Sequence, residues 1–273
     1  MRFSCCTRST SSTESARPAE RQRGNRQPRY FMLSNAARLL MVSAAASLVA
    51  LGAAPAEACQ DIADEALDLA AAQTPLASGA SLFTLIQKNI WAVNNTDLSL
   101  LWGSSSPSSA VYYDNAVDLI DVTGTDPGDD FTPVSSVADI APGDVLVIDA
   151  TGTYSGHTAI VTGLPQQITA INPKIGTDTQ WALPIVDSTT SVHGCSTIYP
   201  DGRFTASTPG SCTGTFRGGV GTAFMRIYAD ATTGALTGHT WSVTSGGTFY
   251  AQSGTTYPVR SFVIARVQSC PLL

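Results

Sequence analysis

Ala141-Pro-Gly-Asp-Val-Leu-Val-Ile-Asp149 and Ser155-Gly-His-Thr-Ala-Ile-Val-Thr-Gly163 are two apolar segments separated by a short polar break. Their β-branched residues are typical of strands, and Gly152 and Gly156 bracket the break, so we predict two neighbouring strands joined by a turn. His157 stands where the second strand begins, and a rigid strand holds an imidazole in the fixed position that a catalytic base needs. Taken alone, the hairpin favours a histidine at a strand end with a structural hydrogen bond.

The segments on either side of this hairpin predict helices before it and further strands after it. Residues 61–73 place apolar side chains on one face and acidic side chains on the other. A second helix is expected from Ala80 to about Val93, and a short helical patch at 110–120. Beyond the hairpin we expect strands at 180–189, 223–229, 235–243 and 260–267. The sequence therefore predicts one α+β domain over residues 59–273, with N-terminal helices packed on an antiparallel sheet of about six strands.

The N-terminus carries the pattern of a secretory signal peptide. Within residues 32–58 a basic residue precedes an apolar run from Leu39 to Ala54, and Ala56-Glu-Ala58 is a cleavage motif that predicts processing before Cys59. The polar residues 1–31 lack apolar periodicity, and we interpret them as a misassigned start of translation or a disordered extension. The expected location is the periplasm or the extracellular medium, with an uncleaved membrane anchor as the alternative.

The leader holds most of the positive charge. Eight of the 15 basic residues and three of the 21 acidic residues precede Cys59, so the remaining chain has 7 basic and 18 acidic residues and a net charge of −11. A surface of that sign argues against nucleic acid and against anionic membranes as partners.

Four cysteines follow the leader, namely Cys59, Cys195, Cys212 and Cys270. An even number in an exported chain predicts disulfides, and three pairings are possible. We favour Cys195 with Cys212, which closes the loop between them, and Cys59 with Cys270, which joins the two ends of the domain. A lipid attached to Cys59 is the alternative, but Ala56 stands where a lipobox has leucine.

The order of these features resembles a known superfamily. A helix that opens at a small-residue turn is followed by Pro-Gly-Asp-Val-Leu at 142–146, by Gly-His-Thr-Ala-Ile-Val at 156–161 and by a strand with a polar end. This order is similar to that of the NlpC-type papain-like peptidases and amidases, to which CHAP domains are similar. Later stretches resemble one exported bacterial subgroup of this superfamily, and they lie at 186–189, 192–194, 218–221, 225–230 and 238–242. The resemblance covers most of residues 60–267 and implies a papain-like fold.

In that superfamily a cysteine at a helix start attacks an amide, a histidine at a strand start removes the thiol proton, and a third polar residue orients the histidine. By position, the resemblance makes His157 the base and Asp187, near the end of the strand 181–189, the orienting residue. An ordinary turn or cap role for Asp187 is the equal alternative.

The nucleophile departs from the family pattern. The Cys-Ser-Gly-Phe motif of the superfamily corresponds here to Ala80-Ser-Leu-Phe83, so an alanine holds the attacking position and thioester chemistry is lost. Ser81 is the adjacent hydroxyl, but one step along a helix turns a side chain by about 100°, away from the histidine. No cysteine after the leader has the spacing to replace the missing thiol.

Other polar residues need their own interpretation. We place His193, Asp201 and Arg203 in the same cleft, because they follow the preceding strand closely. His239 lies in an apolar strand, which favours a structural histidine with satisfied hydrogen bonds. No histidine spacing typical of zinc occurs, and the acidic loop 123–130 does not fit a calcium-loop template, so we expect no metal or other cofactor.

These observations lead to three hypotheses for function. The first is an exported papain-like domain that has lost its catalytic cysteine and acts by binding a partner or a ligand, such as a peptidoglycan stem peptide or a similar amide. The second is a live amide hydrolase of cell-wall peptide with an unusual nucleophile such as Ser81. The third is a structural exported protein.

Overall fold

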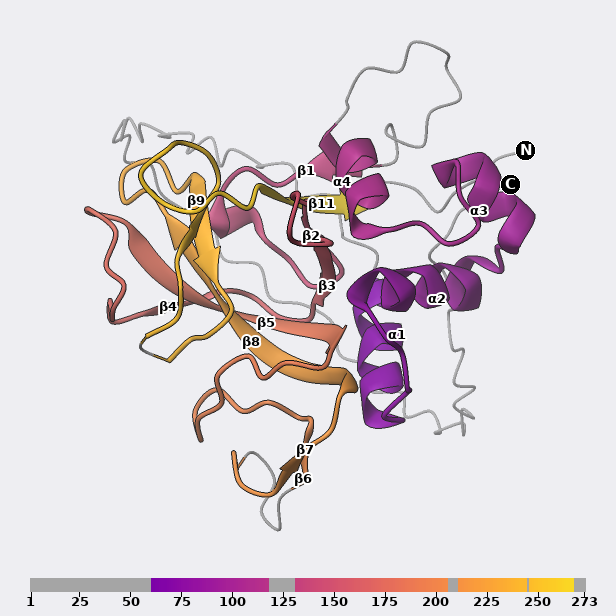
Figure 1. Ribbon diagram of the computed structural model, residues 1–273, viewed down its shortest axis with the longest axis horizontal. Helices are drawn as coiled ribbons and strands as arrows, with labels where there is room; N and C mark the ends of the chain where they lie inside the picture. Colours follow the sequence, from indigo (N-terminus) through magenta and orange to yellow (C-terminus); the bar gives the residue numbers. More distant parts are fainter. Residues whose placement is uncertain (1–59, 118–130, 206–210, 245, 268–273) are drawn as a thin grey trace, which may run out of the picture. The chain divides into compact units, whose positions relative to one another are not determined.

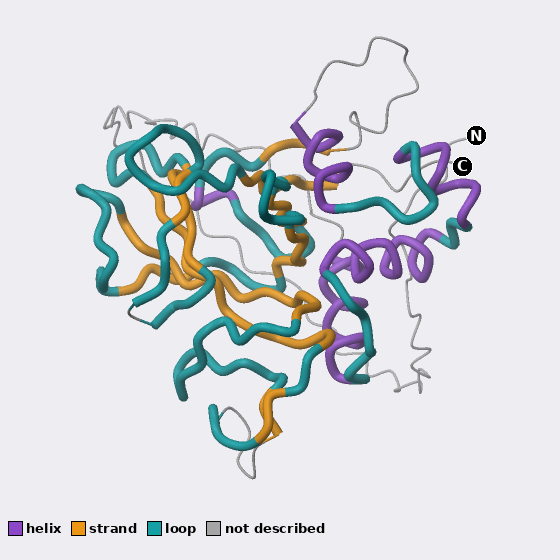
Figure 2. Tube along the Cα trace, in the orientation of Figure 1, coloured by secondary structure: helices purple, strands orange, loops and turns teal. Residues whose placement is uncertain are grey.

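The computed structural model describes residues 60–117, 131–205, 211–244 and 246–267. Within these ranges four α-helices precede the main run of strands (Figure 1 and Figure 2). The helices are α1 (Gln60–Ala71), α2 (Gly79–Trp91), α3 (Asn95–Trp102) and α4 (Ser109–Val117). The predicted helices at 61–73 and 80–93 correspond to α1 and α2, and α4 covers the described part of the predicted patch.

The α3 helix was not predicted, although its N-terminus carries a recognisable signal. Asn94 is its N-cap and accepts hydrogen bonds from the backbone N–H groups of Thr96 and Asp97, while the Asp97 side chain accepts from the Asn94 N–H. This is a capping box, which satisfies donors that the first helical turn would leave free. The residues that follow have weak apolar periodicity, so their spacing does not indicate a helix.

The strands form one sheet of nine in the order β1-β11-β2-β3-β5-β8-β9-β10, with β4 paired to β5, and a separate two-stranded sheet of β6 and β7. Every strand pair is antiparallel. The strands of the large sheet are β1 (Phe131–Pro133), β2 (Val145–Ile148), β3 (His157–Val161), β4 (Gln166–Ile168), β5 (Thr179–Thr189), β8 (Gly219–Ala229), β9 (Leu236–Thr240), β10 (Tyr250–Ala251) and β11 (Phe262–Val267). The small sheet consists of β6 (Phe204–Thr205) and β7 (Thr215–Phe216).

The α+β class and the antiparallel sheet are confirmed, but the predicted number of about six strands was lower than the nine in the main sheet. The strands without a predicted counterpart are short, and β1, β4 and β10 have two or three residues each. A strand of this length is too short to show a period of two, and it exists because a longer neighbour offers hydrogen bonds.

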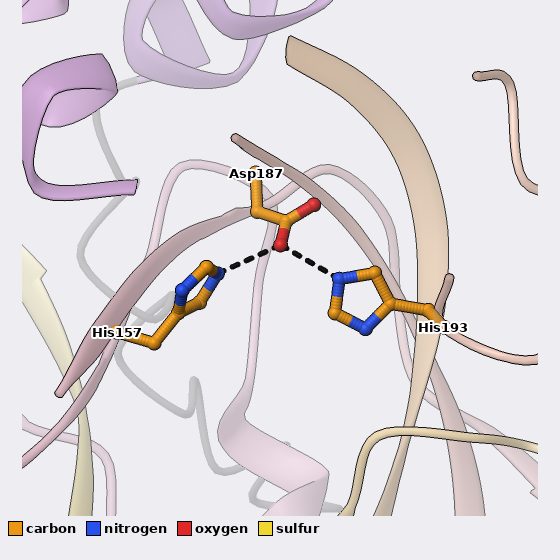
Figure 3. A group of neighbouring side chains, drawn as sticks. All are labelled: His157, Asp187 and His193. Carbon is orange, nitrogen blue, oxygen red and sulfur yellow. Dashed lines mark hydrogen bonds and ion pairs between the residues drawn. The ribbon is translucent and has the colours of Figure 1, made fainter. Parts of the chain in front are cut away.

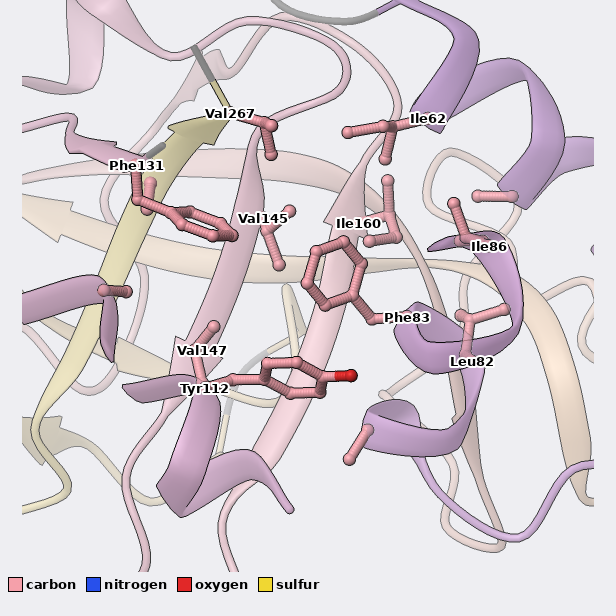
Figure 4. Packing of buried hydrophobic residues seen from close by; sticks show 14 of the residues in the cluster. Ile62, Leu82, Phe83, Ile86, Tyr112, Phe131, Val145, Val147, Ile160 and Val267 are labelled. Atoms are coloured by element: carbon pink, nitrogen blue, oxygen red, sulfur yellow. The ribbon is translucent and has the colours of Figure 1, made fainter. Parts of the chain in front are cut away.

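The central strands are buried on both faces. Val145 and Val147 of β2 point into the hydrophobic cluster that the helices share, whereas Leu146 and Ile148 lie in a second cluster on the opposite face. Phe83 of α2 lies against the β2 and β3 side chains in Figure 4. Alternate side chains of a strand point to opposite faces, so burial on both faces requires the continuous apolar run seen in this hairpin.

The start of α2 lies directly against β3, and Gly79 makes this approach possible. Gly79 is buried, and a Cβ atom at this position would overlap the carbonyl oxygen of Thr158. Ser78 caps the helix and accepts a hydrogen bond from the Ser81 N–H. The α2 N-terminus therefore lies against the residue that follows His157.

The predicted Cys195–Cys212 disulfide is present, with its Cα atoms 5.5 Å apart. The other predicted pair, Cys59 with Cys270, lies outside the described residues, as do the leader 1–58 and the acidic residues of the loop 123–130. Among the helices that the structure describes, none has the length and apolar character needed to cross a membrane.

Candidate functional site

Three side chains from β3, β5 and the loop after β5 meet at one carboxylate oxygen. The β3–β5 register pairs Ala159 with Asp187, and His157 lies two residues before Ala159, so it points to the same face of the sheet. His157 Nε2 and His193 Nε2 each lie 2.7 Å from Asp187 Oδ2. Figure 3 shows the two imidazoles approaching this oxygen from opposite sides. Asp187 thus accepts hydrogen bonds from both rings and is not a turn or cap residue.

Asp201 and Arg203 support Asp187 from behind. One Arg203 Nη atom lies 2.8 Å from Asp187 Oδ1, and the Nε atom and the second Nη atom lie 2.8 and 3.0 Å from the two carboxylate oxygens of Asp201. Both residues are almost fully buried. Arg203 thus holds Asp187 and Asp201 holds Arg203, whereas His193 is the member of the predicted cleft set that lines the pocket beside His157.

The contacts of Asp187 set its charge. Burial by itself would raise the pKa of this carboxyl group, but the positive charge of His193 and the hydrogen bonds from His157 and His193 outweigh burial and hold the pKa well below its ordinary value. Asp187 is therefore a carboxylate, and an ionised carboxylate can only accept hydrogen bonds. Each histidine consequently donates its Nε2–H to it.

The two histidines differ at their other ring nitrogen. His193 Nδ1 lies 3.3 Å from the backbone carbonyl oxygen of Trp241. His157 Nδ1 has no hydrogen-bond partner among the described residues. With Nε2 donating to Asp187, the Nδ1 atom of His157 is the ring nitrogen that a ligand can reach.

Ala80 shares a pocket with His157. This pocket has a volume of about 270 Å³ and is formed by the α2 N-terminus, the residues before α4 and the turn before β3. Its walls include Ala80, Ser81 and His157. Ser81 Oγ lies 2.9 Å from Ser78 Oγ, and in the described part of the chain no hydrogen bond joins it to His157. The structure thus brings together the helix start and the strand start that the sequence placed in one site.

A second pocket lies on the other side of His157. Its volume is about 300 Å³, and His157, His193 and Trp241 form part of its wall. The Trp241 ring packs edge-on against His157, with ring centroids 4.9 Å apart. The sequence reasoning missed this wall, because Trp241 and its neighbours come from segments far apart in the chain and follow no common spacing.

His239 differs from its predicted role. It is completely buried, as expected for a residue of β9, but neither ring nitrogen has a hydrogen-bond partner among the described residues. Burial, followed by the charges of Arg260 and His157, lowers the pKa of His239 to about 3. The expectation of satisfied hydrogen bonds was wrong, because the neighbours of this ring are other aromatic rings.

His157, Asp187 and His193 are also the residues that could hold a metal ion, since their ligand atoms lie within 4.8 Å of one another. The distance of 2.7 Å from each imidazole nitrogen to the shared oxygen is that of a charge-assisted hydrogen bond. Ligands of a tetrahedral zinc ion at about 2.0–2.1 Å would stand about 3.3 Å apart. The arrangement fits a hydrogen-bonded charge network better than a metal centre.

No protein-family model, curated protein or solved structure matches this chain. The chemistry of the site is therefore interpreted from its own geometry.

Proposed function

We propose that this chain is a papain-like, NlpC-type domain in which the catalytic cysteine has been replaced by Ala80, and that it binds a peptide or similar amide ligand without cleaving it. The observation that carries this proposal is the arrangement around His157. Its Nε2 donates to Asp187, its Nδ1 has no hydrogen-bond partner among the described residues, and Ala80 at the start of α2 lines the same pocket.

This arrangement corresponds to a nucleophile–base–orienter relay with the first member missing. In such relays the orienting group fixes the imidazole tautomer so that the other ring nitrogen can take a proton from the nucleophile. The methyl group of Ala80 carries no proton to remove and no atom that could attack a carbonyl. The base and its support thus remain, while covalent catalysis is lost.

The pocket at Ala80 suits the backbone of an amide ligand. A helix N-terminus presents backbone N–H donors, and several serine hydroxyls line the same wall, including Ser106 and Ser108. These donors would receive a carbonyl oxygen, and the free His157 Nδ1 would accept an amide N–H. A cell-wall stem peptide is the ligand class that agrees with the predicted export of the chain.

Restoring the thiol tests the proposed ancestry. We expect Ala80→Cys to react with iodoacetamide at pH 7 about tenfold faster than the matched variant Ser81→Cys, because a thiol at a helix start beside an imidazole ionises more readily. Adding His157→Ala to Ala80→Cys should remove this advantage. Equal reactivity at positions 80 and 81, or no dependence on His157, would show that Ala80 does not occupy the nucleophile position.

An assay of the natural protein on purified peptidoglycan tests whether catalysis has been lost. We expect the protein to sediment with purified peptidoglycan and to release no soluble fragments from it. Fragment release that disappears in Ser81→Ala and in His157→Ala would instead support a hydrolase with Ser81 as the nucleophile. The hydrogen bond of Ser81 to Ser78 argues against that alternative.

A further inference from the structure

The pocket on the Trp241 side of His157 is lined by basic side chains. Among its lining residues are His157, His193 and Arg260, and none of the lining residues is acidic. Asp187 lies nearby, but it is completely buried, and both of its oxygens accept hydrogen bonds from Arg203 and the two histidines. In a chain with 21 acidic and 15 basic residues, this is a local concentration of basic side chains and of hydrogen-bond donors.

Arg260 is held in place by two tyrosine rings. Its Cζ atom lies 3.9 Å from the ring centroid of Tyr154 and 3.9 Å from that of Tyr250. Two rings at this distance cannot share one face of the guanidinium, so they stack on opposite faces. Stacking fixes the plane of the group and leaves its N–H donors pointing outward from the edge.

The donors of this fixed guanidinium have no acidic partner within the described residues. Tyr154 also lines this pocket, and its hydroxyl oxygen is buried and has no hydrogen-bond partner among the described residues. Buried polar groups normally have partners. An arginine that is immobilised but unpaired, beside an unpaired hydroxyl, is what a site for an anionic ligand provides before the ligand binds.

We propose that this pocket binds the carboxylate of a small organic acid or of a peptide terminus, with the guanidinium edge of Arg260 as the main contact. The edge offers two parallel N–H donors that match the two oxygens of a carboxylate. Trp241 and Val192 supply apolar surface for the carbon skeleton, and a volume of about 300 Å³ accommodates a group of amino-acid or dipeptide size. This inference does not depend on a papain-like origin of the domain.

A planar carboxylate fits this geometry better than a tetrahedral phosphate. The Tyr154 and Tyr250 rings confine the space above and below the guanidinium plane. A carboxylate can lie in that plane, whereas a phosphate places at least one oxygen outside it. The site should therefore prefer a carboxylate to phosphate.

Isothermal titration calorimetry with three probes tests the proposal: N-acetylalanine, its uncharged analogue N-acetylalaninamide, and inorganic phosphate. We expect the acid to bind the natural protein at least about tenfold more tightly than the amide and than phosphate, because only the acid forms the paired charge-assisted bonds. Equal binding of the acid and the amide, or no binding of the acid, would overturn the proposal. Equal binding of phosphate would overturn the preference for a carboxylate.

Two variants of Arg260 test whether this residue is the main contact of the carboxylate. Arg260→Gln should weaken binding of N-acetylalanine about tenfold or more, and Arg260→Lys, which keeps the charge but loses the fork, should also weaken it. The matched control is Arg217→Gln, since Arg217 is exposed and lies outside this pocket, and it should change binding less than twofold. Thermal unfolding monitors the fold of each variant. If Arg260→Gln does not fold, the result for Arg260→Lys decides, and unchanged binding in a folded variant would refute the assignment.

Discussion

His239 gives a quantitative test of the charge and packing around the site. The ring is completely buried in β9 and is in contact with the rings of Trp241, Tyr250 and Phe262. Replacement by phenylalanine keeps a flat ring among these neighbours. It also removes two buried nitrogens that lack partners among the described residues.

The magnitude follows from the pKa of His239. Burial is the main cause that lowers it from 6.5 to about 3. The unfolded chain binds a proton below pH 6.5 and the folded protein does not, so His239 reduces the stability of the fold progressively as the pH falls from about 6.5 towards 3. At pH 4.5 the reduction is about 3 kcal/mol, because this pH lies two units below the ordinary pKa of 6.5.

Urea unfolding at pH 7.5 and at pH 4.5 measures this effect. The quantity of interest is the free energy of unfolding of His239→Phe minus that of the natural protein. We expect this difference to be about 3 kcal/mol more favourable to the variant at pH 4.5 than at pH 7.5. Other titrating groups are common to both proteins and largely cancel.

The control is Tyr250→Phe, which changes a ring stacked on His239 but leaves the histidine in place. Its stability relative to the natural protein should not change between the two pH values. If the pH-dependent difference for His239→Phe is below about 0.5 kcal/mol, the folded protein takes up a proton at His239 and the reasoning is wrong.

Three further predictions concern the elements that support the site. Gly79→Ala should lower the free energy of unfolding by about 1–3 kcal/mol, because its Cβ atom would push α2 away from the Thr158 carbonyl; a neutral effect in urea unfolding would contradict this close contact. Replacing Cys195 and Cys212 together by serine should lower the free energy of unfolding by about 3 kcal/mol, as expected for a link with a sequence separation of 17 residues. The control is the reduced natural protein, whose unfolding curve should coincide with that of the variant. Asp187→Asn should cost about 3–5 kcal/mol at pH 7, because it removes the buried negative charge that one Arg203 Nη atom and both imidazoles contact. Since its pKa is lowered, the contribution of Asp187 should persist down to about pH 4 and disappear only at lower pH; a loss that begins near neutral pH would argue against this carboxylate.

The sequence was most informative where the pattern is local. The continuous apolar runs at 145–148 and 157–161 predicted paired strands, and they are β2 and β3 in direct register. The amphipathic periods of the first two helices and the cysteines at 195 and 212 were interpreted correctly for the same reason. Each of these features depends on neighbours in the chain or on a short loop.

The small strands and the surroundings of His157 depend on contacts that have no local pattern. Strands of two or three residues form only because a partner strand lies beside them, so they could not be counted in advance. Asp201 and Arg203 were expected in the cleft, but the sheet places them behind Asp187, where burial requires charges to be paired.

The sequence by itself determined the α+β class, the hairpin that presents His157 and the absence of a cysteine at position 80. Only the tertiary structure decided which residues surround that histidine. It joined His157 and His193 to one oxygen of Asp187, and it placed Arg260 between Tyr154, from the segment before β3, and Tyr250 of β10. The physical reason is that strand periodicity reports which face a side chain takes, whereas the pairing of charges across a fold depends on distances that only the packed sheet establishes.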